Sequence, residues 1–327
     1  MTLNRRAVLR TVVGSLLTVS LASVAQQPAK VPRIGFLRTD HPPQAWIDAF
    51  EQGLRGRGYI PGKSILIDYR FGDGTIAEVS RLAGELVKSK VDVIVAGGGQ
   101  ATRAARNATS TIPIVMTAAT DPGGRGFVAS LAHPGGNITG INTLGWDLFG
   151  KRIELLREIL PKVSRVAVLT NRNNPAPPGA WKDAVAAAAS LSVSLQHIEV
   201  QGATEFDQAF ETAVRGRAEA LVVMQSTVFN TPPYRIAQLA KSHKLPAIYG
   251  TSVTADNGGL MSYGPNNRDS YRYAAVFVDK ILKGAKPGDL PVEQPTKFEL
   301  VISLRTAREL GINIPQSLRL RADQLIE

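Results

Sequence analysis

Short apolar runs rich in β-branched residues alternate with helix-type segments from residue 33 to residue 303. In the segment 43–57, Trp46, Phe50 and Leu54 fall on one helical face at four-residue spacing. Repeated strand–helix pairs of this length predict an α/β fold with doubly wound parallel sheets. The expected strands cover residues 33–37, 64–69, 91–96, 114–116, 165–170, 194–199, 220–224, 247–249, 258–264 and 298–303. The expected helices cover residues 43–57, 76–88, 101–109, 148–159, 180–191, 205–214, 231–243 and 267–282.

The alternation stops in a loop rich in glycine and proline at residues 121–140 and then restarts. A chain of 327 residues is long enough for two domains. We therefore expect two α/β lobes. Ligands of such sheets bind beyond the carboxyl ends of the strands. The loops expected at these ends cover residues 38–42, 97–102, 117–124, 171–175, 225–230 and 249–254.

The first 25 residues have the pattern of an export signal. Three arginines precede an apolar stretch over residues 12–24 that contains no acidic residue. Ser23 and Ala25 provide the small side chains of a cleavage site before Gln26. Two adjacent arginines near the start leave both a twin-arginine and a Sec route open. An uncleaved membrane anchor is the alternative.

Composition excludes several kinds of site. The chain has no cysteine, which rules out disulfides, thiolate metal sites and a cysteine nucleophile. Its four histidines are far apart, and it has neither a nucleophile elbow nor a phosphate-loop motif. We therefore expect no metal, no cofactor and no enzymatic activity. The formal charge is +11, but lysines and arginines are spread along the chain, so we expect no nucleic-acid partner.

Residues 91–105 read VDVIVAGGGQATRAA, an apolar strand that breaks on three glycines into a helix. A helix N-terminus leaves unpaired backbone N–H groups, and together with the helix dipole these favour a carboxylate or phosphate. The alternative is that the glycines only permit a tight turn. The sequence therefore predicts an anion-binding turn at this point.

The most specific stretches of the chain resemble one family of ABC-transporter substrate-binding proteins, the group that includes tryptophan-type and other aromatic amino-acid binders. These stretches cover residues 121–142, 258–264 and 274–311; the first reads DPGGRGFVASLAHPGGNITGIN. The chain departs from the family's usual Thr-Pro or Ser-Pro at Gly99-Gln100, so the ligand stays open.

The resemblance implies a type I periplasmic-binding fold, in which two lobes joined by three crossings close over a ligand. The crossings are expected near residues 140–143, 254–259 and 292–296. Lobe 1 would comprise residues 31–141 plus 260–292, and lobe 2 residues 144–256 plus 296–327.

We expect a monomeric periplasmic receptor that binds an amino acid or another carboxylate, aromatic ones included, and delivers it to an ABC permease. A ligand-sensing domain and an enzyme on the same scaffold are the alternatives. Arg38 and Arg172 also lie near strand ends. We expect them to be solvated, and the alternative is that they pair with an acidic ligand. Thr39 as a helix cap, Asn171 and Asn174 as turn residues and Tyr263 as a hinge-packing residue remain open. The expected ligand contacts are Thr39, Gly98, Gly99, Gln100, Ala101, Thr120, Asn171, Ser226, Tyr249 and Tyr263.

Overall fold

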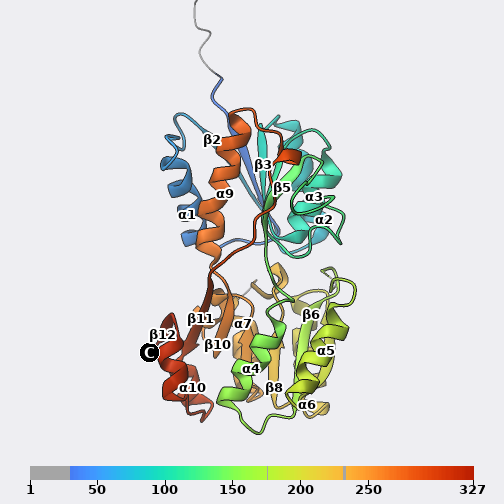
Figure 1. Ribbon diagram of the computed structural model, residues 1–327, viewed down its shortest axis with the longest axis vertical. Helices are drawn as coiled ribbons and strands as arrows, with labels where there is room; N and C mark the ends of the chain where they lie inside the picture. The colour runs from blue at the N-terminus through green and yellow to red at the C-terminus, as the bar shows by residue number, and fades with distance from the viewer. Residues whose placement is uncertain (1–29, 175, 231–232) are drawn as a thin grey trace, which may run out of the picture. The chain divides into compact units, whose positions relative to one another are not determined.

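The computed structural model describes residues 30–174, 176–230 and 233–327, so the predicted export signal lies outside the described residues. Residues from Val31 to Glu327 form one unit. It alternates strands and helices as the sequence predicts (Figure 1). The strands are β1 (Arg33–Arg38), β2 (Leu66–Phe71), β3 (Val93–Gly97), β4 (Ile114–Ala119), β5 (Ile138–Asn142), β6 (Arg165–Asn171), β7 (Ser194–Val200), β8 (Ala220–Val223), β9 (Ala247–Tyr249), β10 (Met261–Pro265), β11 (Phe298–Ser303) and β12 (Gln324–Ile326).

The helices are α1 (Gln44–Arg55), α2 (Ile76–Lys88), α3 (Gly99–Ala108), α4 (Phe149–Ile159), α5 (Ala180–Ser190), α6 (Phe206–Arg215), α7 (Pro233–Ser242), α8 (Ser252–Asp256), α9 (Asn267–Leu282), α10 (Leu304–Glu309) and α11 (Gln316–Arg321). Short 3-10 turns lie at Ala203–Glu205, Thr227–Asn230 and Pro287–Asp289.

The first sheet has the order β2-β1-β3-β4-β5 and is parallel throughout. Alternate side chains of its central strands face opposite cores. Val93 and Val95 pack with α1 and α9, whereas Ile94 and Ala96 pack with α2 and α3. Figure 1 shows α9 beside α1, although the two helices are far apart in the chain. Helices therefore cover both faces, which explains the continuous apolar strands.

The second sheet has the order β12-β11-β10-β9-β8-β6-β7. Its strands pair in parallel except for β10 and β11, which run antiparallel. Helices α4 and α5 pack on one face around Val166 and Val168, and α6 and α7 pack on the other around Ala167 and Leu169. The two doubly wound α/β layers are therefore as predicted, with a single antiparallel pair added.

The chain passes between the two sheets three times. It leaves the first sheet after β5 and enters α4, which packs on the second sheet. It returns between β10 and α9 and leaves again after Val292, which is buried in the core of the first sheet. Glu293 forms a parallel bridge with Ile141, so the first and third passages lie side by side.

One part of the predicted layout needs correction. We expected residues 260–292 in lobe 1, with a crossing near residues 254–259. Instead, β10 pairs with β9 and β11 of the second sheet, and the chain crosses at Asn266, just after β10. The glycines that flank this strand resemble a hinge, but the sheet to which a strand belongs depends on distant pairing partners. The rest of the lobe division stays a prediction.

Strand β5 lies partly inside the segment that the sequence indicates as a loop. Gly140 in this strand has φ +129°, and an ideal Cβ at this residue would lie 2.1 Å from the Met116 carbonyl oxygen. The glycine thus allows β5 to approach β4 closely, at a bulge in their pairing. It also interrupts the apolar pattern by which the strand would have been recognised.

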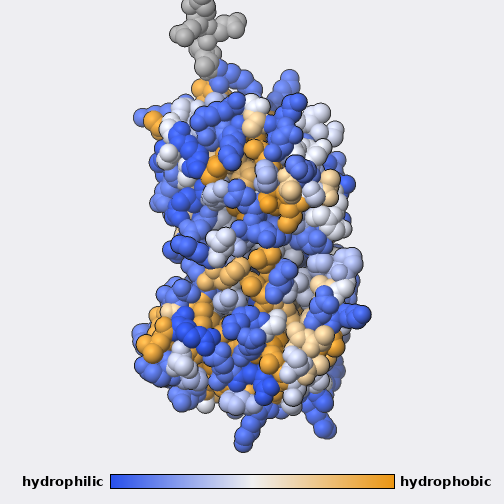
Figure 2. Space-filling view, in the orientation of Figure 1, coloured by the Kyte–Doolittle hydropathy of each residue, from blue (hydrophilic) through white to orange (hydrophobic). Residues whose placement is uncertain are grey.

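On the face drawn in Figure 2, hydrophilic side chains predominate and apolar ones form small groups. None of the helices in the described ranges is both long enough and apolar enough to span a membrane.

Candidate functional site

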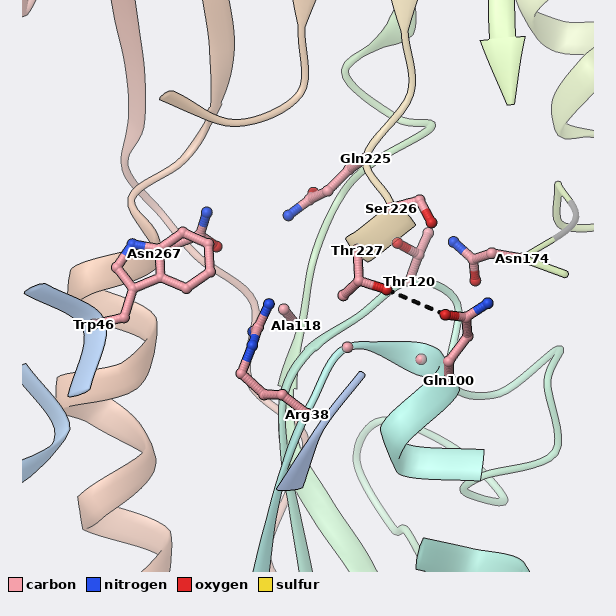
Figure 3. Close-up of a pocket in the computed structure, with 12 residues that line it drawn as sticks. Arg38, Trp46, Gln100, Ala118, Thr120, Asn174, Gln225, Ser226, Thr227 and Asn267 are labelled. Carbon is pink, nitrogen blue, oxygen red and sulfur yellow. Dashed lines mark hydrogen bonds between the residues drawn. The ribbon is translucent and has the colours of Figure 1, made fainter. Parts of the chain in front are cut away.

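A small cavity lies where the carboxyl ends of strands from both sheets meet (Figure 3). In the first sheet the winding direction changes between β1 and β3, and in the second between β6 and β8. Ligands of α/β sheets bind at such switch points. The cavity is lined by Arg38, Trp46, Gly98, Gly99, Gln100, Ala118, Thr120, Asn174, Gln225, Ser226, Thr227 and Asn267.

The turn between β3 and α3 forms one side of the cavity. Gly98 has φ +90°, a conformation that strongly favours glycine, and α3 begins directly after it with no side-chain cap. The Gly98 carbonyl accepts hydrogen bonds from the backbone N–H and the hydroxyl of Thr102, at 3.0 and 2.9 Å. The first N–H groups of α3 have no acceptor within the helix. The turn therefore has the geometry expected for an anion-binding site.

Gly97 allows the side chains of Arg38 and Tyr271 to pack directly against the backbone. An ideal Cβ there would lie 2.8 Å from Arg38 Nη1 and 2.6 Å from the Tyr271 hydroxyl oxygen. Only a residue without a side chain leaves room for the guanidinium to lie against this turn. The first of the three glycines therefore places a cation beside the N-terminus of α3.

Arg38 corrects our expectation of a solvated side chain. It is 2% exposed, its Nη2 lies 2.5 Å from Asp40 Oδ1, and its Nη1 donates to the Tyr271 hydroxyl. Its guanidinium carbon lies 5.1 Å from the Trp46 ring centroid. Burial acts to lower the pKa of Arg38, but Asp40 and Tyr271 outweigh it and the pKa is raised. The buried cation thus stays charged.

Arg172, in contrast, is solvated as expected. Its side chain is 54% exposed and lies 3.9 Å from Glu205. It does not line the cavity.

Thr227 links the two sides of the cavity. Its hydroxyl accepts a hydrogen bond from Thr39 at 2.8 Å and donates one to Gln100 Oε1 at 3.1 Å, the bond drawn in Figure 3. Thr39 and Gln100 follow strands of the first sheet, whereas Thr227 follows β8 of the second. These bonds hold strand-end segments of the two sheets together across the cavity.

Five of the ten predicted contact residues line the cavity: Gly98, Gly99, Gln100, Thr120 and Ser226. Two others contact residues of the lining. Thr39 donates to Thr227, and Asn171 donates to the Ser226 hydroxyl at 2.9 Å. Ala101 lies fully buried in the core between α2 and the first sheet.

The two tyrosines that we predicted as ligand contacts, Tyr249 and Tyr263, do not line the cavity. Tyr249 is buried among residues of α6 and α7, because β9 points this side chain to the core. Its hydroxyl has no hydrogen-bond partner among the described residues, and burial raises its pKa. Tyr263 packs against Phe298, with ring centroids 6.1 Å apart, and its carbonyl accepts a bond from Arg152. Neither side chain reaches the cavity.

Several lining residues were not among the predicted contacts. Five of them lie in loops that the strand pattern placed at the carboxyl edge of the sheets: Arg38, Ala118, Asn174, Gln225 and Thr227. Their place in the fold was therefore predicted, but not that they line the cavity. Trp46 had been assigned to the buried face of its helix, and it is indeed only 6% exposed. Asn267, at the start of α9, had no signal beyond its place in the helix; its amide donates to Thr251 at 3.0 Å.

The cavity volume is about 30 Å³, which is room for about two water molecules. A larger molecule requires the surrounding loops to move apart. Among the described residues no group of three or more His, Asp or Glu side chains is arranged to hold a metal ion.

Comparison with known proteins supports this fold. A curated relative, "Tyrosine-binding protein" of Clostridioides difficile (strain R20291), is 27% identical over 263 residues, which cover 80% of this chain and 75% of the relative. The crystal structure of a conserved domain protein from Vibrio cholerae matches with a TM-score of 0.85 at 26% identity, over 90% of this chain and 100% of that one. An ABC domain from Streptococcus pneumoniae in complex with L-Trp matches with a TM-score of 0.83 at 25% identity, over 90% and 99% of the two chains.

The fold and the position of the cavity define a solute-binding protein of the periplasmic-binding class. The family model described as "ABC transporter substrate binding protein" matches residues 39–326. The chain belongs to this family, whose members are typically periplasmic or otherwise extracytoplasmic.

Proposed function

We propose that the protein is the receptor of an ABC importer, and that it encloses one small organic molecule with a carboxylate group and delivers it to a membrane permease. The observation that carries the proposal is the cavity at the switch points of both sheets, beside the N-terminus of α3. The relatives named for tyrosine and solved with L-Trp support an amino acid or another carboxylate, aromatic ones included, as ligand.

In this proposal the backbone N–H groups of Gly99, Gln100 and Ala101 hold the carboxylate, as the helix N-terminus favours. Arg38 adds a charge beside the same turn, and Thr120 and Ser226 add hydroxyl groups from the two sides. Thr39 and Asn171 position Thr227 and Ser226 through the hydrogen bonds described above.

Binding is coupled to closure. The cavity has room for little more than water in this conformation, so the ligand would enter when the strand-end loops of the two sheets separate. Contacts made only when they close again, such as those of Thr227, then favour the ligand-bound state. We propose export through a signal at residues 1–25, a monomeric receptor, and release of the ligand unaltered, with neither cofactor nor nucleic acid involved.

A ligand screen tests the proposal. The purified protein is melted in the presence of amino acids, aromatic acids and small organic acids. A compound that binds only the folded state raises the Tm with the logarithm of its excess over Kd. The bound compound is then recovered and identified by mass spectrometry. Chemical conversion of that compound, or no stabilisation by any member of the screen, would contradict a receptor of this kind.

Two substitutions of Gln100 test the anion site. Gln100→Ala removes the side chain that accepts from Thr227 but keeps the backbone N–H, whereas Gln100→Pro removes both. Because a hydrogen bond to a charged group contributes about 1.5–3 kcal/mol, the proline variant should bind at least about tenfold more weakly than the alanine variant. Melting without ligand checks that both variants fold. Equal affinities would exclude a carboxylate held by this N–H group.

A further inference from the structure

The charges around the cavity restrict its ligand further. We propose that the site selects a carboxylate that carries no ammonium group, an organic acid rather than a zwitterionic amino acid. This inference rests on the receptor function proposed above and names the class of solute.

The lining of the cavity is positive on one side and neutral elsewhere. Among the described residues that line it, Arg38 is the one charged side chain, and no aspartate or glutamate is present. The other polar groups are amides, hydroxyls and backbone atoms. The N-terminus of α3 adds the positive end of a helix dipole.

The two positive features lie together. Arg38 packs over Gly97, immediately before the turn that opens α3. Its Nε is buried and has no hydrogen-bond partner among the described residues. In Figure 3 the side chain points into the space between Asn267 and Ala118. An anionic group bound at α3 would thus lie close to a buried cation.

The carboxylate that pairs with Arg38 is not available to a bound ligand. Asp40 is 1% exposed, lies 2.5 Å from Arg38 Nη2 and is absent from the cavity lining. It compensates the guanidinium and leaves no carboxylate for a second cation.

An ammonium group would therefore be buried without a counter-charge. The acceptors available to it are neutral. Gln225 Oε1 has no hydrogen-bond partner among the described residues, and Gln100 Oε1 already accepts from Thr227. Desolvating a cation costs far more than desolvating a methylene group unless an anion pairs with it, and Arg38 would repel it. A deaminated acid avoids both penalties.

Matched pairs of compounds test this inference by isothermal titration calorimetry on the purified protein. The pairs are 3-phenylpropanoate with L-phenylalanine, 3-(4-hydroxyphenyl)propanoate with L-tyrosine, 3-(indol-3-yl)propanoate with L-tryptophan, 4-methylpentanoate with L-leucine, and propanoate with L-alanine. For at least one pair the acid should bind at least about tenfold more tightly than the amino acid. The neutral amide of that acid should not bind. An amino acid that binds as tightly as its acid, or failure of every acid to bind, would overturn the inference.

The two proposals fail in different ways. If other compounds of the wider screen bind and none of these acids does, the receptor function stands and the acid preference is wrong. If no compound of the wider screen binds, the receptor function fails as well.

A substitution of one lining residue tests the charge argument directly. Gln225→Glu places a carboxylate in the cavity with almost no change of shape. It should weaken binding of the best acid by about tenfold or more and narrow its advantage over the matching amino acid. Gln196→Glu is the control, because Gln196 Oε1 is also buried and without a partner among the described residues but lies outside the cavity. A Gln225→Glu protein with an unchanged preference would count against the inference.

Discussion

Arg38 and Asp40, two residues apart at the end of β1, form an ion pair whose side chains are 2% and 1% exposed. Neither oxygen of the Asp40 carboxylate has a further hydrogen-bond donor among the described residues. Each charge is therefore compensated mainly by the other. Removing one partner leaves an uncompensated buried charge, whereas removing both leaves none.

This pair leads to the first prediction. Asp40→Asn should lower the free energy of unfolding by about 3–5 kcal/mol, because it leaves the Arg38 guanidinium unpaired in the protein interior. The double variant Arg38→Met/Asp40→Leu should cost less than this single change. Urea unfolding at neutral pH measures both. A double variant at least as destabilised as Asp40→Asn would show that the pair is not held by mutual charge compensation.

Gly97 offers a steric prediction. Gly97→Ala should destabilise the protein by about 1–3 kcal/mol, because the new methyl group meets Arg38 and the Tyr271 hydroxyl at distances that force a shift. Gly84→Ala in α2 is the matched control, since its methyl group would have no heavy atom within 4 Å. The control should gain about 0.5–1 kcal/mol from helix propensity. Thermal melts distinguish the two, and equal shifts would refute the close approach.

Removal of the Thr227 hydroxyl should affect ligand binding more than the stability of the fold. Thr227→Val keeps the shape but loses the bonds to Thr39 and Gln100. At about 0.5–1.5 kcal/mol for each of the two bonds, ligand affinity should fall by at least about fivefold. Thr212→Val, which removes an exposed hydroxyl bond within α6, should leave affinity unchanged. Calorimetry with a ligand from the screen decides between these outcomes.

The sequence predicted the two α/β layers because their signal is local. Val93 to Ala96 are apolar on both faces, and this pattern is enough to indicate a buried parallel strand. Strand β10 shows that the assignment of a strand to a sheet is not a local property. Its residues indicate a strand, but membership of the second sheet depends on pairing with β9 and β11, which no neighbouring residue reveals.

The same distinction applies to the site. Position at a strand end identified the loops, and thereby Gly98, Gly99, Gln100, Thr120 and Ser226. It could not tell that Tyr249 points to the core while Gln225 points to the cavity. Arg38 was misjudged because burial of an arginine depends on partners that the sequence does not place beside it, here Tyr271 from α9. Strand-end position therefore predicts which loops form a site, and tertiary contacts decide which side chains face it.

Arg152 in α4 is a buried cation without a carboxylate partner among the described residues. It donates to the carbonyls of Gly145 and Tyr263, at 2.7 and 2.9 Å, and burial lowers its pKa to about 10. Arg152→Met should cost about 2–4 kcal/mol, because the carbonyls of Gly145 and Tyr263 each lose a charged donor. Arg157→Met on the same helix removes a single donor to Leu191 from a partly exposed position, so it should cost less. Urea unfolding compares them, and an equal loss would contradict the assigned role.

Glu299 in β11 predicts a pH dependence of stability. Burial, together with Asp323 and Asp269, raises its pKa, and the hydrogen bond from Asn266 and the charge of Arg268 oppose this only in part. The folded state therefore binds the proton more tightly than the unfolded state. The ionised carboxylate weakens the fold above the folded-state pKa, and this penalty is relieved as the pH falls through that value.

Glu299→Gln keeps the acceptor for Asn266 and removes the charge. Its Tm should exceed that of the unsubstituted protein at about pH 8, and the difference should shrink toward about pH 4, where the glutamate is itself protonated. Glu211→Gln, at an exposed position of α6, should show a smaller change over the same range. Melting curves recorded from about pH 8 down to about pH 4 measure the effect, because Glu299 changes from ionised to protonated over this range. A difference that grows as the pH falls would mean that the folded protein stabilises the Glu299 carboxylate, the opposite of the direction derived from its burial.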